Sequence, residues 1–193
     1  AIGDVSGKGI PASLFMAISK TLTGTLTRRH KDLGAALQDV ERELNRANPE
    51  YLFVTSFVGV INVESGTMEF VCAGHDAPLV RRAGITSSID TAATSGPPLC
   101  AAGDYPFATG HAQLQPGDLL CLYTDGVTEA SNGCEMFGAQ RLREVIASSM
   151  NELSLQKQIE VLRDSVRQFE SGYPPVDDLT LMLARWTGRP LGG

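Results

Sequence analysis

Gly3-Asp4-Val5-Ser6-Gly7-Lys8-Gly9, near the start of the chain, places a carboxylate at the end of an apolar run and follows it with a glycine-rich turn. Two further acidic turns lie far downstream, Tyr123-Thr124-Asp125-Gly126 and Val176-Asp177-Asp178-Leu179-Thr180. Each adjoins an apolar run typical of a strand, and strand ends that are distant in sequence can converge in space. Carboxylates gathered without Cys or His partners suit Mg²⁺ or Mn²⁺ rather than zinc. The sequence therefore predicts metal-assisted chemistry on an anionic substrate.

The bulk composition is that of one ordinary globular domain. The chain has 193 residues, of which 42% are hydrophobic and 20% charged, enough to bury a sizeable core. Its 16 basic and 22 acidic residues give a net charge of -6. An acidic chain without a basic run is a poor candidate for binding nucleic acid or an anionic membrane. The longest apolar runs are also far too short to span a bilayer.

The cysteines and the start of the chain give two further expectations. Four cysteines show no CxxC spacing, which predicts reduced, mostly buried thiols in a cytoplasmic protein: Cys72, Cys100, Cys121 and Cys134. The chain has no initiator Met and begins inside an expected strand. We therefore expect a fragment of a longer polypeptide.

Two apolar stripes near the N-terminus predict amphipathic helices that lie on a sheet. Their members are Leu14, Ile18, Leu22 and Leu26 in the first, and Leu33, Leu37, Val40 and Leu44 in the second. Pro11 stands in the first turn of the first helix, where its missing N–H costs nothing. Two more helices are predicted over residues 139–149 and 154–170.

Alternation with period two predicts strands in most of the remaining chain. They cover residues 1–5, 53–61, 67–73, 78–82, 85–89, 107–114, 118–124 and 179–186. We expect strand 107–114 to pair with strand 118–124 across Gln115-Pro116-Gly117. Helix pairs around antiparallel hairpins predict an α+β fold, a layered α-β-β-α sandwich of antiparallel sheets flanked by helices. Residues 1–187 would form one domain and residues 188–193 a tail.

The first motif is not a phosphate-binding P-loop. That loop needs four residues between its first glycine and Gly-Lys, but only three intervene here, and Gly9 follows Lys8. Its glycines would let main-chain carbonyls approach a cation closely. Asp4 alone could equally be a turn residue that caps a helix. Lys8 could meet a phosphate oxygen or be a solvated lysine before the helix.

The downstream acids also have two interpretations. Asp125 is either an ordinary turn residue before Gly126 or a partly buried carboxylate that needs a cation or hydrogen bonds. Asp177 and Asp178 adjoin a strand that looks buried, and their mutual repulsion is relieved if one binds metal. His75 could act as an acid or base, although a histidine in a turn is more often structural.

Four collinear motifs resemble one family over essentially the whole chain. The segment from Gly3 to Ala17 resembles the signature of the SpoIIE/RsbU-type branch of the PPM (protein phosphatase 2C-like) metal-dependent serine/threonine phosphatases. Residues 73–79 are similar to the Ala-Gly-His segment of that branch, residues 122–130 to its Thr-Asp-Gly motif, and residues 177–180 to its closing acidic motif.

The resemblance implies a site with two Mn²⁺ or Mg²⁺ ions. In this site Asp4 would bridge the ions, and the main-chain carbonyl of Val5, Asp125 and Asp177 would be further ligands. Asp178 stands where eukaryotic relatives usually carry Asn, so it would at most support the ligands.

Two departures from the family pattern matter. Ser6 occupies the place of a histidine that is proposed as the general acid in eukaryotic relatives. The family also takes another metal-binding Asp from a strand before the first motif, and this chain begins too late to contain that strand. We therefore expect weak metal binding by these residues alone.

The resemblance implies hydrolysis of phosphoserine or phosphothreonine on a protein by metal-activated water, without a covalent phosphoenzyme. The implied substrate is a bacterial signalling regulator such as an anti-anti-sigma (STAS) protein, and the implied regulator is an upstream sensor or receiver domain. The alternative is a non-catalytic module that binds a phosphoprotein or transmits a signal and carries a vestigial metal site. Metal-dependent turnover would distinguish the two.

Overall fold

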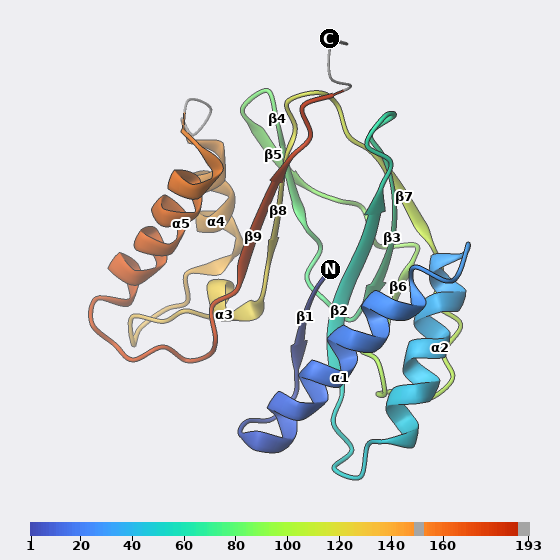
Figure 1. Ribbon diagram of the computed structural model, residues 1–193. Helices are drawn as coiled ribbons and strands as arrows, with labels where there is room; N and C mark the ends of the chain where they lie inside the picture. Colours follow the sequence, from blue (N-terminus) through green and yellow to red (C-terminus); the bar gives the residue numbers. More distant parts are fainter. Residues whose placement is uncertain (149–152, 189–193) are drawn as a thin grey trace. The chain divides into compact units, whose positions relative to one another are not determined.

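The computed structural model describes residues 1–148 and 153–188, which form two compact units (Figure 1). Unit 1 comprises residues 1–61, 67–75 and 90–112, and unit 2 comprises residues 62–66, 76–89 and those from 113 onward. Each unit contains one sheet and the helices that cover it. The chain crosses from one unit to the other several times, so neither unit is continuous in sequence.

The sheet of unit 1 brings the first strand of the chain against the first long hairpin. Its strands are β1 (Ile2–Val5), β2 (Val54–Ile61), β3 (Thr67–Ala73), β6 (Ser95–Gly96) and β7 (Gly110–Gln113). The order is β1-β2-β3-β6, and β7 also pairs with β3. β1, β2 and β3 run antiparallel, and β6 is parallel to β3. In this register Asp4 of β1 lies opposite Thr55 of β2.

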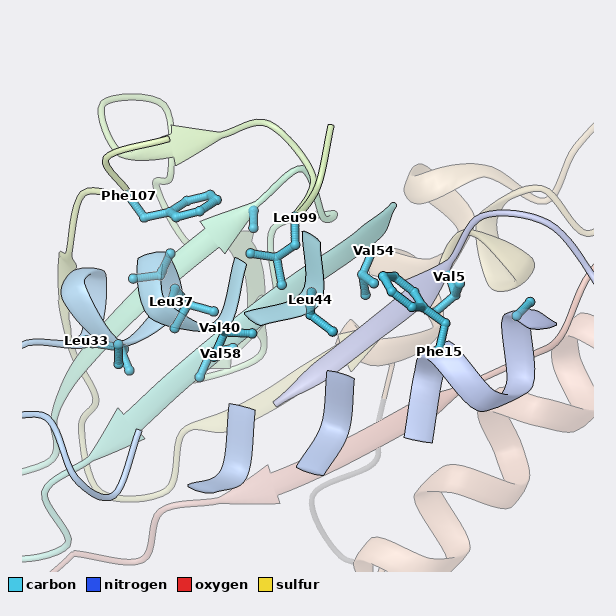
Figure 2. Close-up of a cluster of buried hydrophobic side chains, with 14 residues drawn as sticks. Val5, Phe15, Leu33, Leu37, Val40, Leu44, Val54, Val58, Leu99 and Phe107 are labelled. Atoms are coloured by element: carbon cyan, nitrogen blue, oxygen red, sulfur yellow. The ribbon is translucent and has the colours of Figure 1, made fainter. Parts of the chain in front are cut away.

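Two helices, α1 (Ile10–Leu26) and α2 (Leu33–Arg46), supply the helical half of the core of unit 1. α2 begins where the side chain of Asp32 accepts a hydrogen bond from the N–H of Ala35 at 2.7 Å, a standard N-cap. The predicted stripe of α2 is confirmed, since all four of its residues are buried. Figure 2 shows all four with side chains of the sheet.

The predicted stripe of α1 is wrong in its first half. Leu14 is 61% exposed and Ile18 is 41% exposed, whereas Ala12, Phe15 and Ser19 are buried. α1 has apolar residues on more than one face, so their spacing does not determine which face meets the sheet. The buried face consists of one large ring and two small residues, which let the helix approach its neighbours closely.

The sheet of unit 2 is fully antiparallel, in the order β5-β4-β8-β9. Its strands are β4 (Leu79–Arg82), β5 (Ile85–Ser88), β8 (Leu119–Tyr123) and β9 (Leu181–Arg185). All five residues of β8 are buried, as expected for a central strand. Helices α4 (Gly138–Ala147) and α5 (Leu155–Glu170) cover one face (Figure 1), and α3 (Asp125–Thr128) is a single turn after β8.

The predicted pairing of strand 107–114 with strand 118–124 is wrong. β7 pairs with β3 in the first sheet, and β8 lies between β4 and β9 in the second. The segment between β7 and β8 is hydrogen-bonded to other parts of the chain. The N–H of Leu114 donates to the carbonyl of Gly66, and the N–H of Gly117 donates to the carbonyl of Trp186. A turn sequence therefore separates two sheets here instead of closing a hairpin.

The remaining expectations largely agree with the structure. The α+β class is confirmed, with two mostly antiparallel sheets and helices on each. β6 and α3 were not predicted, because elements of two and four residues leave no periodic signal. The end of predicted helix 139–149 and nearly all of the predicted tail lie outside the described residues. None of the helices in the described ranges is long and apolar enough to cross a membrane.

Candidate functional site

The first acidic motif lies at the end of β1 in unit 1. Asp4 is partly exposed, and the strand that carries it lies tightly against β2. A Cβ on Gly3 would lie 2.7 Å from the carbonyl oxygen of Thr55, so only glycine permits this approach. Ser6 then holds the turn to the start of β2, because its Oγ accepts from the N–H of Phe53 at 2.9 Å and its own N–H donates to the carbonyl of Phe53.

The turn after Asp4 leads directly into α1. Gly7 and Gly9 have φ values of 85° and 84°, in the left-handed region that favours glycine. Lys8 between them is exposed. It stands just before the N-terminus of α1, where the helix dipole and the main-chain N–H groups favour an anion. The contact of Lys8 with a phosphate oxygen stays a prediction.

His75 lies at the same end of the sheet of unit 1. Its Nδ1 is 3.0 Å from Oγ1 of Thr55, the residue opposite Asp4. Its carbonyl accepts a hydrogen bond from Sγ of Cys72 at 3.1 Å. Thr55 was not singled out from the sequence, since nothing local marks a strand threonine as the residue opposite an acid.

In unit 2 the structure brings the two downstream acidic turns together through Thr124. This residue is 2% exposed and precedes α3 in an extended conformation. Its Oγ1 donates to the carbonyl of Asp178 at 3.2 Å and accepts from the N–H of Thr180 at 3.1 Å, while its own N–H donates to the carbonyl of Thr180 at 3.2 Å. Three hydrogen bonds thus clamp the turn that carries Asp125 to the turn that carries Asp177 and Asp178.

Gly126 shows how closely the main chains of these turns approach. A Cβ at this position would lie 2.2 Å from the carbonyl oxygen of Asp178, a distance that no side chain tolerates. The N–H of Asp178 also donates to Oδ1 of Asp177 at 2.8 Å, which orients that carboxylate. Gly126 is therefore needed for the two turns to pack together, in addition to being typical of a turn after Asp.

Of the two interpretations of Asp125, the one that made its carboxylate partly buried is wrong. Asp125, Asp177 and Asp178 are all exposed. α3 begins at Asp125, and its buried residues are Gly126 and Val127. Exposed carboxylates that are held on a fixed backbone are open to ligands, so the correction leaves the metal interpretation intact.

The predicted metal ligands are divided between the units. Asp4 and the carbonyl of Val5 belong to unit 1, and Asp125 and Asp177 belong to unit 2. Within residues 1–148 and 153–188 no group of three or more His, Cys, Asp or Glu side chains is arranged to hold a metal. The donors are all carboxylate or carbonyl oxygens, however, which is the chemistry that Mg²⁺ and Mn²⁺ select.

The cysteines are poorly suited to nucleophilic catalysis. All four are free thiols; Cys72 and Cys121 are buried, Cys100 is partly buried and Cys134 is exposed. Burial raises the pKa of Cys121 to about 12. Burial, assisted by the negative charge of Glu41, raises the pKa of Cys100 to about 12 as well. Thiolates are therefore disfavoured at both positions at neutral pH.

The sequence matches the family model described as stage II sporulation protein E (SpoIIE) over residues 1–187. It is 27% identical over 185 residues to the phosphoserine phosphatase RsbU of Bacillus subtilis, a match that covers 96% of this chain and 54% of RsbU. The chain thus spans about half or less of the length of the curated relatives it matches.

Solved structures show the same fold. The SiaA-PP2C domain of Pseudomonas aeruginosa superposes with a TM-score of 0.79 at 16% identity, covering 95% of this chain and 72% of that one. The RsbU and RsbW domains of Rv1364c from Mycobacterium tuberculosis give a TM-score of 0.77 at 24% identity, covering 97% of this chain and 51% of that one. At these identities the likeness establishes the fold alone.

Proposed function

This chain belongs to the SpoIIE family of PPM-type, PP2C-like serine phosphatase domains, and we propose from this membership that it removes phosphate from phosphoserine or phosphothreonine on a protein. The observation that carries the proposal is the clamp of Thr124 to Asp178 at 3.2 Å. It holds two of the acidic motifs in one arrangement although 54 positions separate the two residues. The clamp continues the pairing of β8 with β9, in which Tyr123 lies opposite Leu181, and it keeps the two acidic turns adjacent.

The residues that would hold Mn²⁺ or Mg²⁺ are Asp4, Asp125, Asp177 and the main-chain carbonyl of Val5. Their oxygen donors fit a hard cation. When bound, such ions lower the pKa of a coordinated water and neutralise charge on the phosphate oxygens. The contact between Gly126 and the main chain of Asp178 keeps the turn from shifting, and ligands fixed in this way need little reorganisation.

Lys8 would contribute on the substrate side. The residue is exposed at the entry to α1, where its ammonium group would contact an oxygen of the phosphoryl group while the helix N-terminus favours the same negative charge. His75 and Ser6 have fixed main-chain or side-chain partners in unit 1, and neither is assigned a role in the proposed reaction.

The proposed substrate is a phosphorylated STAS-domain regulator of the anti-anti-sigma type. Two findings support this choice: RsbU, a relative, is a phosphoserine phosphatase, and one structural neighbour joins RsbU and RsbW domains in a single protein. Regulation by an attached sensor or receiver domain is part of the same proposal and rests on the family resemblance alone.

The substrate class can be tested with the natural, full-length protein in Mn²⁺. We expect rapid phosphate release from a phosphoserine-bearing STAS protein and little from a phosphotyrosine peptide. Equal rates of phosphate release from the two substrates would contradict the proposed specificity for phosphoserine and phosphothreonine. Tight binding of the phosphoprotein without turnover in either metal would instead support a non-catalytic binding module.

A further inference from the structure

A row of polar side chains crosses the sheet of unit 2 at the end remote from the acidic turns. Thr86 of β5 lies opposite Arg81 of β4, Arg81 lies opposite Leu119 of β8, and Leu119 lies opposite Arg185 of β9. Directly opposed residues in antiparallel strands point to the same face. Leu119 belongs to the same buried core cluster as Ile146 of α4, so the row lies on the face that the helices cover.

Within this row, two buried polar atoms have no hydrogen-bond partner in the described part of the chain. They are Oγ1 of Thr86 and Nη2 of Arg185. Arg81 is only 4% exposed, and its one described hydrogen bond is a long one, from Nη1 to the carbonyl of Ile146 at 3.4 Å. No ion pair within residues 1–148 and 153–188 includes Arg81 or Arg185.

The next residue along β4 shows the contrast. Arg82 points to the opposite face and donates three hydrogen bonds to the carboxylate of Asp118, one of them 2.6 Å long. The chain thus supplies a buried acid to Arg82 but places a second arginine near Arg81. Burial, together with the positive charge of Arg185, lowers the pKa of Arg81.

Capping of α4 explains only part of this arrangement. The bond from Arg81 to the carbonyl of Ile146 stabilises the C-terminal end of the helix but occupies one of the five N–H donors of the guanidinium. Among residues 1–148 and 153–188 it leaves the buried Arg81 and the partly buried Arg185 without a counter-charge, and buried charges without counter-charges are costly. An anion bound between them would remove this cost.

We propose that Arg81, Arg185 and Thr86 form a binding site for a tetrahedral oxyanion of the phosphate type. Two guanidiniums present many N–H donors in planar forks that match phosphate oxygens, and the hydroxyl of Thr86 adds a donor on the other side of Arg81. A single carboxylate would leave most of these donors unsatisfied. Figure 1 shows the strands that carry the row: β5 and β4 pack against α4, and β9 packs against α5.

This site is distinct from the acidic turns of the same unit. Leu119 is the first residue of β8, whereas Asp125 lies two residues beyond its last, Tyr123, so at about 3.3 Å per residue roughly 17–20 Å of chain separates Leu119 from Asp125. The inference does not depend on the proposed phosphatase activity.

The test uses inorganic phosphate as the probe, with EDTA present so that metal-bound phosphate does not contribute. We expect calorimetric titration of the full chain to show one phosphate per chain. Thermal unfolding should shift upward in phosphate relative to sodium chloride at equal ionic strength, because a ligand that binds only the folded state stabilises it. Arg185→Leu should weaken phosphate binding by about tenfold or more, as expected for the loss of a charge-assisted hydrogen bond.

Two controls make the outcome decisive. Arg143→Gln removes a positive charge from α4, where Arg143 donates to the hydroxyl of Ser88, and should leave phosphate binding unchanged. Thr86→Val should weaken binding while the fold persists, because it removes only a hydroxyl that has no described partner. If the wild-type chain binds no phosphate at any phosphate concentration up to about 10 mM, the proposal is overturned. Equal losses in Arg143→Gln and Arg185→Leu would overturn it too, because they would reveal a general charge effect.

Discussion

The hydroxyl of Thr124 donates a hydrogen bond to the main-chain carbonyl of Asp178 at 3.2 Å. The two residues are 54 positions apart, yet this bond and its two neighbours fix the spacing of the acidic turns that they flank. The carboxylates themselves remain exposed. The arrangement combines a rigid, buried support with exposed carboxylates, as the proposed metal site would require.

Thr124→Val should loosen this clamp. The variant keeps the shape of the side chain but loses two hydrogen bonds, so we expect it to lower the free energy of unfolding by about 1–2 kcal/mol and to reduce turnover by roughly ten- to a hundredfold through misplaced ligands. Chemical denaturation and a phosphate-release assay measure the two effects. Thr21→Val, at an exposed position of α1, is the control and should change neither by a comparable amount.

Gly126→Ala and Gly24→Ala should change stability in opposite directions. A Cβ on Gly126 would lie 2.2 Å from the carbonyl of Asp178, whereas nothing lies within 4 Å of a Cβ on Gly24 in α1. We expect the first change to destabilise the protein by about 1–3 kcal/mol through overpacking and the second to stabilise it by about 0.5–1 kcal/mol. Equal unfolding midpoints for the two variants would show that the acidic turns do not pack as described.

Asp125→Asn and Asp177→Asn should separate catalysis from folding. Each change removes a charged ligand, so we expect turnover at saturating Mn²⁺ to fall by orders of magnitude. Thermal stability without metal should hold or rise, since like-charge repulsion between the turns decreases. Asp164→Asn, at an exposed residue that pairs with Arg163 on α5, is the matched control. Unchanged activity in both site variants would show that Asp125 and Asp177 are ordinary turn residues and not metal ligands.

Asp118 should make the protein sensitive to acid. Burial alone would raise its pKa, but hydrogen bonds from Arg82 and from the N–H of Gln115, with the positive charge of Arg82, hold that pKa below its ordinary value of 3.8. A carboxylate with a lowered pKa stabilises the folded state above pH 3.8, and this contribution disappears as the pH falls through the lower folded-state value. Unfolding free energies measured from pH 6 to pH 2 should therefore fall less steeply in Asp118→Asn than in the wild type.

The sequence predicts helices best where one face is clearly apolar. All four stripe residues of α2 are buried, because that helix has a single apolar face. On α1 the same spacing selected Leu14 and Ile18, which are exposed, because apolar residues occur around much of the helix and tertiary packing chooses among them.

Long-range pairing is what the sequence could not supply. Gln115-Pro116-Gly117 has the composition of a hairpin turn, but β7 and β8 join different sheets. For the site, the motifs identified Asp125 and Asp177 as related, and the structure confirms that their turns are in contact. The residue that joins them, Thr124, was quoted only as part of a motif, since a hydrogen bond across 54 positions has no local signature.

Phosphate release from a phosphoserine-bearing STAS protein, followed with the natural full-length protein in Mn²⁺ and again in excess EDTA, tests the central claim most directly. The account predicts multiple turnovers in Mn²⁺, loss of activity in EDTA and recovery when Mn²⁺ is restored, without a covalent phosphoenzyme. Full activity in EDTA, or capture of a phosphorylated cysteine, would contradict it.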